Sequence, residues 1–122
     1  MAKDDYDNLV FRILVYLYAC LKRKADFDER VLTQKIVTGV VNEEYFIDVL
    51  RMMQQEGYVE GVAFTRAWGR EYILTDGLGS LSITPEGIHY LKDNSRMQSI
   101  KDRVLEGVPG AVMELVKLAL MA

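Results

Sequence analysis

The stretch that most constrains the fold is "LSITPEGIHYLKDNS", residues 81–95, which predicts a strand that turns directly into a short helix. Thr84 is a residue type preferred at a helix N-cap, and Pro85 follows at the first helical position, where its missing N–H costs nothing. Glu86 places a negative charge near the positive end of the helix dipole. Gly87 has no side chain, so the start of the helix can press against the strand. We therefore expect a strand-to-helix corner that closes a small sheet.

Three helical patterns precede this corner. Residues 4–24 have Asp at the front, an apolar middle and basic residues at the end, which complements the helix dipole at both ends. The apolar surface is wider than one stripe, so we expect this helix to have two neighbours. Asp28 is the expected N-cap of a short second helix. Asn42 and Gly57 are the expected limits of a third, longer helix.

Strand signals lie between the third helix and the corner. "YVEGVAFT" and "REYIL" are rich in β-branched and aromatic residues, and the short loop "RAWG" joins them into a predicted hairpin. The irregular stretch "TDGLGS" then leads into the strand "LSI". This order of elements predicts an α+β fold, a winged helix-turn-helix with a two-stranded or three-stranded wing and additional C-terminal helices.

From residue 39 to residue 95 the chain resembles the YjcQ-like family of small winged-helix proteins, found in Gram-positive bacteria and their phages. The resemblance rests on "EGYVEGV" at 56–62, a tyrosine-containing strand at 71–74 and the stretch at 81–95. "TDGLGS" and the apolar tail depart from the family pattern. The resemblance implies a winged-helix fold and no known catalytic activity. The last stretch is similar to the family motif L-T-x-x-G-x-x-Y-L-x-x-N, through Ile83 (where Leu is usual), Thr84, Gly87, Tyr90, Leu91 and Asn94.

Composition narrows the classes of function. The 122 residues suit one compact unit, and 15 Lys and Arg against 18 Asp and Glu give a net charge of −3, so binding to DNA has to be argued from local side chains. Cys20 is the only cysteine and His89 the only histidine, which leaves one chain without a disulfide, a multi-histidine metal site or a hydrolase triad. We expect no enzyme, no metal and no cofactor, and we expect His89 to face solvent.

The apolar run at residues 13–21 predicts neither an export signal nor a membrane span. The net-negative "KDDYDN" precedes it, whereas a signal peptide begins with positive charge. The run is also far shorter than the roughly 20 residues that cross a bilayer. We expect a cytoplasmic protein without a membrane partner.

The predicted helix at 42–56 occupies the position of a recognition helix. Its Arg51, Gln54 and Gln55 are residue types that read guanine or adenine edges. Arg66 and Arg70 flank the hairpin turn, where a wing can reach a minor groove or the DNA backbone. These five residues are the predicted DNA-binding set of a regulator of phage or mobile-element type.

The charge of the same helix supports an alternative function. Its N-terminal half carries Glu43, Glu44 and Asp48, and these carboxylates would repel phosphates in the usual helix-turn-helix approach. Trp68 lies at the tip of the predicted hairpin and belongs to a residue type enriched in interface hot spots. The alternative is a winged helix that binds another protein through Trp68, Glu44 and Asp48 and does not bind DNA. An ordinary solvated helix face, with Trp68 folded back on the sheet, is a third interpretation.

We divide the chain into a winged-helix domain at 1–95 and a C-terminal helical extension at 96–122, packed on the first helix or on a dimer partner. The end of the extension, "AVMELVKLALMA", is charged only at Glu114 and Lys117. A helix that is apolar around most of its circumference must be covered on several sides, which favours a homodimer. The expected dimer interface comprises Val112, Leu115, Val116, Leu118 and Ala119.

Overall fold

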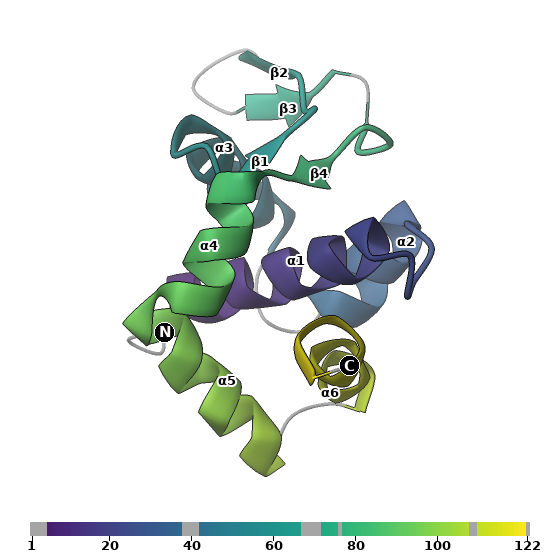
Figure 1. The fold of residues 1–122 in the computed structure, drawn as a ribbon. Coiled ribbons are helices and arrows are strands. Elements are labelled where there is room, and N and C mark those ends of the chain that lie inside the picture. The colour runs from purple at the N-terminus through teal and green to yellow at the C-terminus, as the bar shows by residue number, and fades with distance from the viewer. Residues whose placement is uncertain (1–4, 38–41, 67–71, 76, 108–109, 122) are drawn as a thin grey trace.

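The structure, a computed structural model, describes residues 5–37, 42–66, 72–75, 77–107 and 110–121. Within these ranges the chain forms six α-helices, two π-helical segments and two antiparallel sheets of two strands each (Figure 1). The fold class is α+β, as the sequence predicts. In chain order the elements are α1 (Asp5–Leu21), α2 (Glu29–Val31), η1 (Leu32–Ile36), α3 (Glu43–Gln55), β1 (Val59–Glu60), β2 (Phe64–Arg66), β3 (Tyr72–Leu74), β4 (Ser82–Ile83), α4 (Pro85–Asp93), α5 (Ser95–Gly107), α6 (Gly110–Val116) and η2 (Lys117–Met121).

The helix α1 is the centre of the core. It crosses the middle of the molecule, with both sheets on one side and α5 and α6 on the other (Figure 1). Every side chain from Leu9 to Leu17 is buried, because α3, α4, α5, α6, η1 and β4 all pack around this helix. The wide apolar surface of α1 therefore has at least the two neighbours that the sequence predicts.

One charged side chain lies inside this core. Arg12 is only 8% exposed; its Nε donates to Asn8 Oδ1 at 2.8 Å, and its Nη1 donates to the Ile36 carbonyl oxygen at 3.1 Å. Burial lowers the pKa of the Arg12 guanidinium, but an arginine starts so far above neutrality that it stays charged. The bond to Ile36 ties α1 to the end of η1, and the bond to Asn8, within α1, helps to hold the buried cation in place.

The helix α3 begins and ends as the sequence predicts. Asn42 Oδ1 accepts the Tyr45 N–H at 2.8 Å, which satisfies a donor of the first turn. Gly57 follows the helix with a φ of 85°, a left-handed conformation that glycine adopts without strain. The buried residues of α3 are Phe46, Ile47, Val49, Leu50 and Met53.

The strands form two separate sheets. The first joins β1 to β4, with Val59 opposite Ile83. The second is the hairpin of β2 and β3, with Arg66 opposite Tyr72. Both sheets are antiparallel and neither shares a strand with the other, so the chain changes partner between β1 and β2.

Gly61 marks the change of partner and interrupts the strand that the sequence predicts from 58 to 65. Its φ is 91°, and a Cβ at this position would overlap the Ser80 carbonyl oxygen. A residue with a side chain would therefore be both strained and obstructed here. Residues 61–63 lie outside both sheets and connect β1 to the hairpin.

The strand-to-helix corner forms as predicted. Thr84 caps α4, because its Oγ1 accepts the Gly87 N–H at 3.0 Å while Pro85 occupies the first turn. The Thr84 hydroxyl also donates to the carbonyl oxygen of Gly57, and its N–H donates to that of Tyr58 at 3.1 Å. A Cβ on Gly87 would overlap the Tyr58 carbonyl oxygen. The corner thus closes the first sheet and also fastens it to the end of α3.

The C-terminal extension packs on α1 of its own chain, which is one of the two arrangements expected from the sequence (Figure 1). Four of the five residues expected at a dimer interface, Val112, Leu115, Val116 and Ala119, are buried within the single chain, and Leu118 is half-buried. Lys22 Nζ donates to the Ala119 carbonyl oxygen at 2.9 Å and helps to hold the end of the tail. Since α1, α5 and η1 already cover this helix, its apolar sequence does not require a second chain, and the homodimer stays a prediction.

Candidate functional site

The candidate site lies where α3 meets the hairpin, and its centre is the ring of Tyr72. The guanidinium carbon of Arg51, from α3, lies 4.5 Å from the ring centroid. The guanidinium carbon of Arg66, from β2, lies 5.5 Å from the same centroid. Both distances are in the range of cation–π contacts, which contribute about 0.5–1 kcal/mol each at exposed sites. One tyrosine therefore brings together two arginines that are far apart in the sequence.

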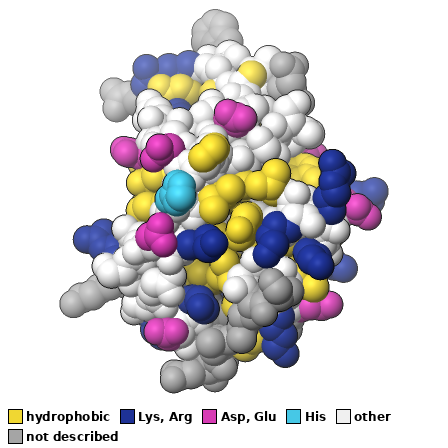
Figure 2. Space-filling view, in the orientation of Figure 1, with side chains coloured by type: hydrophobic (Ala, Val, Ile, Leu, Met, Phe, Trp, Pro, Cys, Tyr) yellow, Lys and Arg dark blue, Asp and Glu magenta, His cyan; other side chains and the backbone are white. Residues whose placement is uncertain are grey.

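The register of the hairpin explains half of this arrangement. Arg66 and Tyr72 are directly opposite each other in the β2–β3 pair, so their side chains project from the same face of the sheet. The other half comes from the packing of α3 against β3, which places Arg51 over that face. In Figure 2, basic side chains lie beside hydrophobic ones at the hairpin end of the molecule.

Arg51 is held more firmly than Arg66. Its side chain is half-buried, its Nη1 donates to Gln55 Oε1 at 3.4 Å, and its buried Nε has no hydrogen-bond partner among the described residues. Arg66 is exposed. In the described part of the chain neither arginine forms an ion pair. Both positive charges are therefore free of a neutralising carboxylate there.

Gln54 does not join this surface. Its Nε2 donates to the Val62 carbonyl oxygen at 2.8 Å, and its Oε1 accepts the Val62 N–H at 3.0 Å. Both polar groups of the amide are thus engaged by one backbone unit, and Gln54 cannot contact a base without breaking these bonds. Gln55, the next residue, is exposed beside Arg51. Of the two glutamines expected to read bases, only Gln55 is on the open surface.

The carboxylates named for a protein interface lie nearer the start of α3. Glu44 is exposed in the first turn, where it complements the helix dipole, and Asp48 is half-buried one turn later. Arg51 and Gln55 follow toward the C-terminal end. The helix is therefore acidic in its first half and cationic at the hairpin. Arg70 and Trp68, the other two predicted site residues, lie outside the described residues.

A cavity of about 460 Å³ opens beside the first half of α3, between that helix, α2, η1 and the end of β3. Phe46, Ile47 and Leu78 line its apolar part, and Glu29 lies at its polar part. Glu29 Oε1 accepts the Leu78 N–H at 2.9 Å, so this carboxylate holds the loop before β4. The cavity separates α2 from the hairpin but does not include the two arginines on Tyr72.

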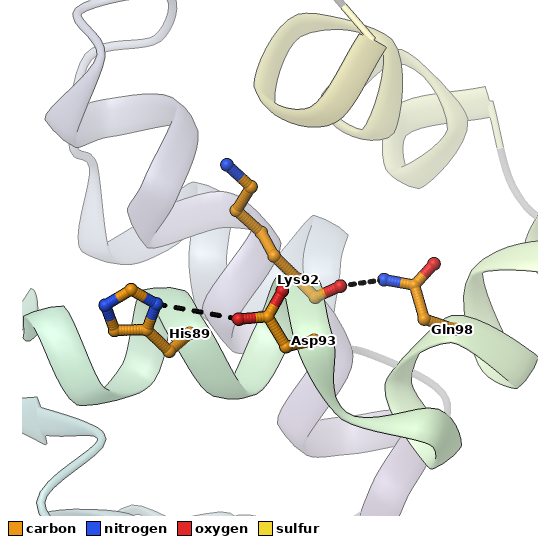
Figure 3. Close-up of polar contacts among 4 residues, drawn as sticks. All are labelled: His89, Lys92, Asp93 and Gln98. Carbon is orange, nitrogen blue, oxygen red and sulfur yellow. Dashed lines mark hydrogen bonds and ion pairs between the residues drawn. The ribbon is translucent and has the colours of Figure 1, made fainter.

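The only histidine of the chain is on the surface, as the sequence predicts. His89 Nδ1 lies 3.6 Å from Asp93 Oδ2 one turn along α4, and the two side chains are 74% and 75% exposed (Figure 3). Nearby, the Gln98 amide donates to the Lys92 carbonyl oxygen at the junction of α4 and α5 (Figure 3). The first contact lies within α4, and the second joins α4 to α5.

The only cysteine of the chain, Cys20, is half-buried. Burial raises the pKa of the Cys20 thiol, which disfavours the nucleophilic thiolate. Across the described ranges no three His, Cys, Asp or Glu side chains come together as a metal site. Nor is any helix among the described residues long and apolar enough to pass through a bilayer.

Tyr72 is the site residue that sequence reasoning missed. Its strand is visible in the sequence, but the position of Tyr72 opposite Arg66 depends on the register of the hairpin. The loop "RAWG" contains no two-residue turn signal of the kind that fixes a register. A symmetric hairpin closed by this loop at 66–69 would place Tyr72 opposite Ala63, whereas in the structure Arg66 belongs to β2 and lies opposite Tyr72, so the sequence carried no signal for this contact.

Comparison with known proteins places the chain in a family. No curated protein and no solved structure matches it. A family model described as YjcQ protein matches residues 11–105, which run from α1 through α5 and include Arg51, Gln54, Arg66 and Tyr72. The match covers both sheets and most of the chain, and it leaves out α6 and η2. The chain therefore belongs to the YjcQ family.

Proposed function

We propose that this protein is a winged-helix DNA-binding protein in which α3 is the recognition helix and the β2–β3 hairpin is the wing. The observation that carries the proposal is the convergence of Arg51 and Arg66 on the ring of Tyr72. The two cations come from the helix and the hairpin, the two elements with which such a domain contacts a duplex.

The chemistry of the pair suits phosphate. A guanidinium presents planar, parallel N–H donors that match the oxygens of a phosphate, and its charge does not titrate near neutral pH. Arg51 is stacked on Tyr72 and half-buried, so it loses little side-chain freedom when it binds. We therefore assign the two arginines to the DNA backbone. Gln55 is the residue of α3 placed to contact a base edge.

The charge along α3 sets the direction of approach. Glu43, Glu44 and Asp48 occupy its first half, and phosphates would be repelled there. The proposed interface therefore uses the C-terminal half of α3 and the hairpin, with the first turn of the helix directed away from the duplex. This differs from the usual helix-turn-helix approach, in which the N-terminal residues of the recognition helix enter the groove.

Salt dependence tests the proposal. The full-length protein is titrated against random duplex DNA at several salt concentrations. Two neutralised phosphates contribute a slope of about −1.8 to log K against log salt, and Arg66→Ala should make the measured slope shallower by about 0.9. Arg96→Ala is the matched control, because it removes one exposed arginine from the start of α5, which lies on the opposite side of α1 from the hairpin (Figure 1).

Two results would contradict the proposal. One is the absence of binding at low salt, which would favour the alternative of a protein-binding winged helix. The other is an equal change in slope for Arg66→Ala and Arg96→Ala, which would mean that binding follows total charge and not the site on Tyr72.

A further inference from the structure

Gln54 has a role that its residue type does not indicate. We infer that Gln54 is a positioning residue, a brace whose side-chain amide sets the hairpin against α3 and so holds Arg66 beside Arg51. It is not a base-reading residue. The effect on DNA affinity rests on the proposed function, whereas the brace itself does not.

The need for a brace comes from the change of strand partner. Val62 lies between β1 and β2, where the chain has left β4 and has not yet begun to pair with β3. Val62 is only 8% exposed. A buried backbone N–H and C=O without partners would be costly, so both must be satisfied from outside the sheets.

The amide of Gln54 supplies both partners. It donates to the Val62 oxygen at 2.8 Å and accepts the Val62 N–H at 3.0 Å, the pattern by which one strand residue pairs with another. A primary amide is well suited to this task because it carries a donor and an acceptor on one rigid plane. The connection between the sheets is therefore paired to a helix side chain in place of a strand.

The position of Gln54 on α3 relates the brace to the candidate site. Gln54 follows Arg51 by three residues, so both side chains point to the same side of the helix. Gln54 holds the base of the hairpin at Val62, and Arg51 contacts the hairpin at Tyr72. With the base released, the hairpin can turn relative to α3, and the two guanidiniums are no longer held over one ring.

Gln54→Glu tests the brace without DNA. The introduced carboxylate can accept the Val62 N–H but repels the Val62 oxygen, whereas the protonated carboxyl can make both bonds. Its pKa in the folded state should therefore lie above the ordinary value for Glu, by about one unit or more. The variant should then match the wild type below about pH 4 and become less stable as the pH rises through this raised pKa, with an approximately tenfold loss in the folding equilibrium constant at neutral pH.

Gln55→Glu is the matched control for this experiment. It adds the same charge at the next residue, on the exposed side beside Arg51, where a carboxylate is favoured over the acid. Urea denaturation of the wild type and both variants from about pH 4 to pH 7 compares them. A loss of stability for Gln54→Glu that does not recover at low pH, or that equals the change for Gln55→Glu, would overturn the brace.

Gln54→Met tests the consequence for binding. The substitution keeps the length and the neutral charge of the side chain and removes both bonds to Val62. If the hairpin is positioned by the brace, affinity for duplex DNA should fall at least about fivefold, because the arginine pair is no longer preorganised. Amide hydrogen exchange at Val62 and in β2 should become faster in the same variant.

Gln98→Met is the control for the binding experiment. It makes the same chemical change and also removes a glutamine bond to a backbone oxygen, but at the α4–α5 junction (Figure 3). Its affinity for DNA should stay within about twofold of the wild type. Unchanged affinity and unchanged exchange in Gln54→Met would overturn the inference. If the wild type itself does not bind DNA, the proposed function fails, while the pH and exchange experiments still decide on the brace.

Discussion

The two sheets differ in how closely they are joined to the end of α3. The β1–β4 sheet is joined by a close backbone approach: the N–H of Thr84 donates to the carbonyl oxygen of Tyr58, its hydroxyl donates to that of Gly57, and Gly87 leaves no room for a Cβ. The β2–β3 hairpin is held by side chains, through Gln54 on Val62 and through Arg51 on Tyr72.

Burial follows the same division. Val59 and Ile83, opposite each other in the first sheet, are 1% and 6% exposed, whereas Ile73 in the hairpin is 45% exposed. Because the start of α4 approaches the Tyr58 backbone too closely for a side chain at Gly87, α4 and the first sheet should separate only when this part of the protein unfolds. Side-chain contacts on a half-open hairpin can break locally, so the hairpin should open at lower free energy than the first sheet. The hairpin, which is proposed to bind DNA, is therefore the region that can change its position without unfolding the rest of the protein.

The largest effect on stability is expected from Gly87→Ala, which introduces a side chain where α4 contacts the first sheet. The new Cβ would overlap the Tyr58 carbonyl oxygen and lie 2.8 Å from Ile83 Cγ1, and neither α4 nor β4 can move without the other. We expect a loss of about 3 kcal/mol in the free energy of unfolding, at the upper end for an overpacked core site. Urea denaturation measures it.

Gly79→Ala is the control for that substitution. A Cβ on Gly79 would meet no atom within 4 Å, and its φ is not in the left-handed region. Its stability should stay within about 0.5 kcal/mol of the wild type. Equal stability of the two alanine variants would show that the strand-to-helix corner can accommodate a side chain at Gly87 and is not rigid.

A smaller effect is expected from Thr84→Val in the same corner. Valine keeps the shape of threonine but loses the cap on the Gly87 N–H and the bond to the Gly57 carbonyl oxygen. The loss should be about 1–2 kcal/mol, as for other N-cap residues. Thr84→Ser keeps the hydroxyl and should recover most of the stability. If the serine variant unfolds as readily as the valine variant, the hydroxyl is not what fastens the corner to α3.

Sequence reasoning succeeded where one short segment determines its own structure. The caps at Asp28, Asn42 and Thr84 all form, because each needs only a side-chain oxygen and an N–H two or three residues later. The exposure of His89 on α4 follows from helical periodicity and is confirmed.

Features that depend on distant segments could not be predicted in this way. The interruption at Gly61 depends on the carbonyl of Ser80, and the role of Gln54 depends on which backbone unit lies unpaired beside it. The composition of the tail shows that it must be buried but not by which chain, and in the structure α1 of the same chain buries it. The candidate site shares this limit, since Arg51 and Arg66 meet only through Tyr72.

The smallest effect on global stability is expected from Tyr72→Leu in the hairpin. Leucine keeps an apolar side chain but removes the ring under Arg51 and Arg66, so about 1 kcal/mol of cation–π stabilisation is lost. Because the hairpin can open without the rest, this loss should appear mainly as faster amide exchange in β2 and β3, with little change in exchange across β1 and β4. Tyr72→Phe keeps the ring and should exchange like the wild type. Faster exchange in all four strands of the leucine variant would contradict the division, because it would mean that the hairpin opens only when the first sheet does. Faster exchange in the phenylalanine variant would instead show that the Tyr72 hydroxyl stabilises the hairpin. The ring would then not be the group that holds the two arginines together.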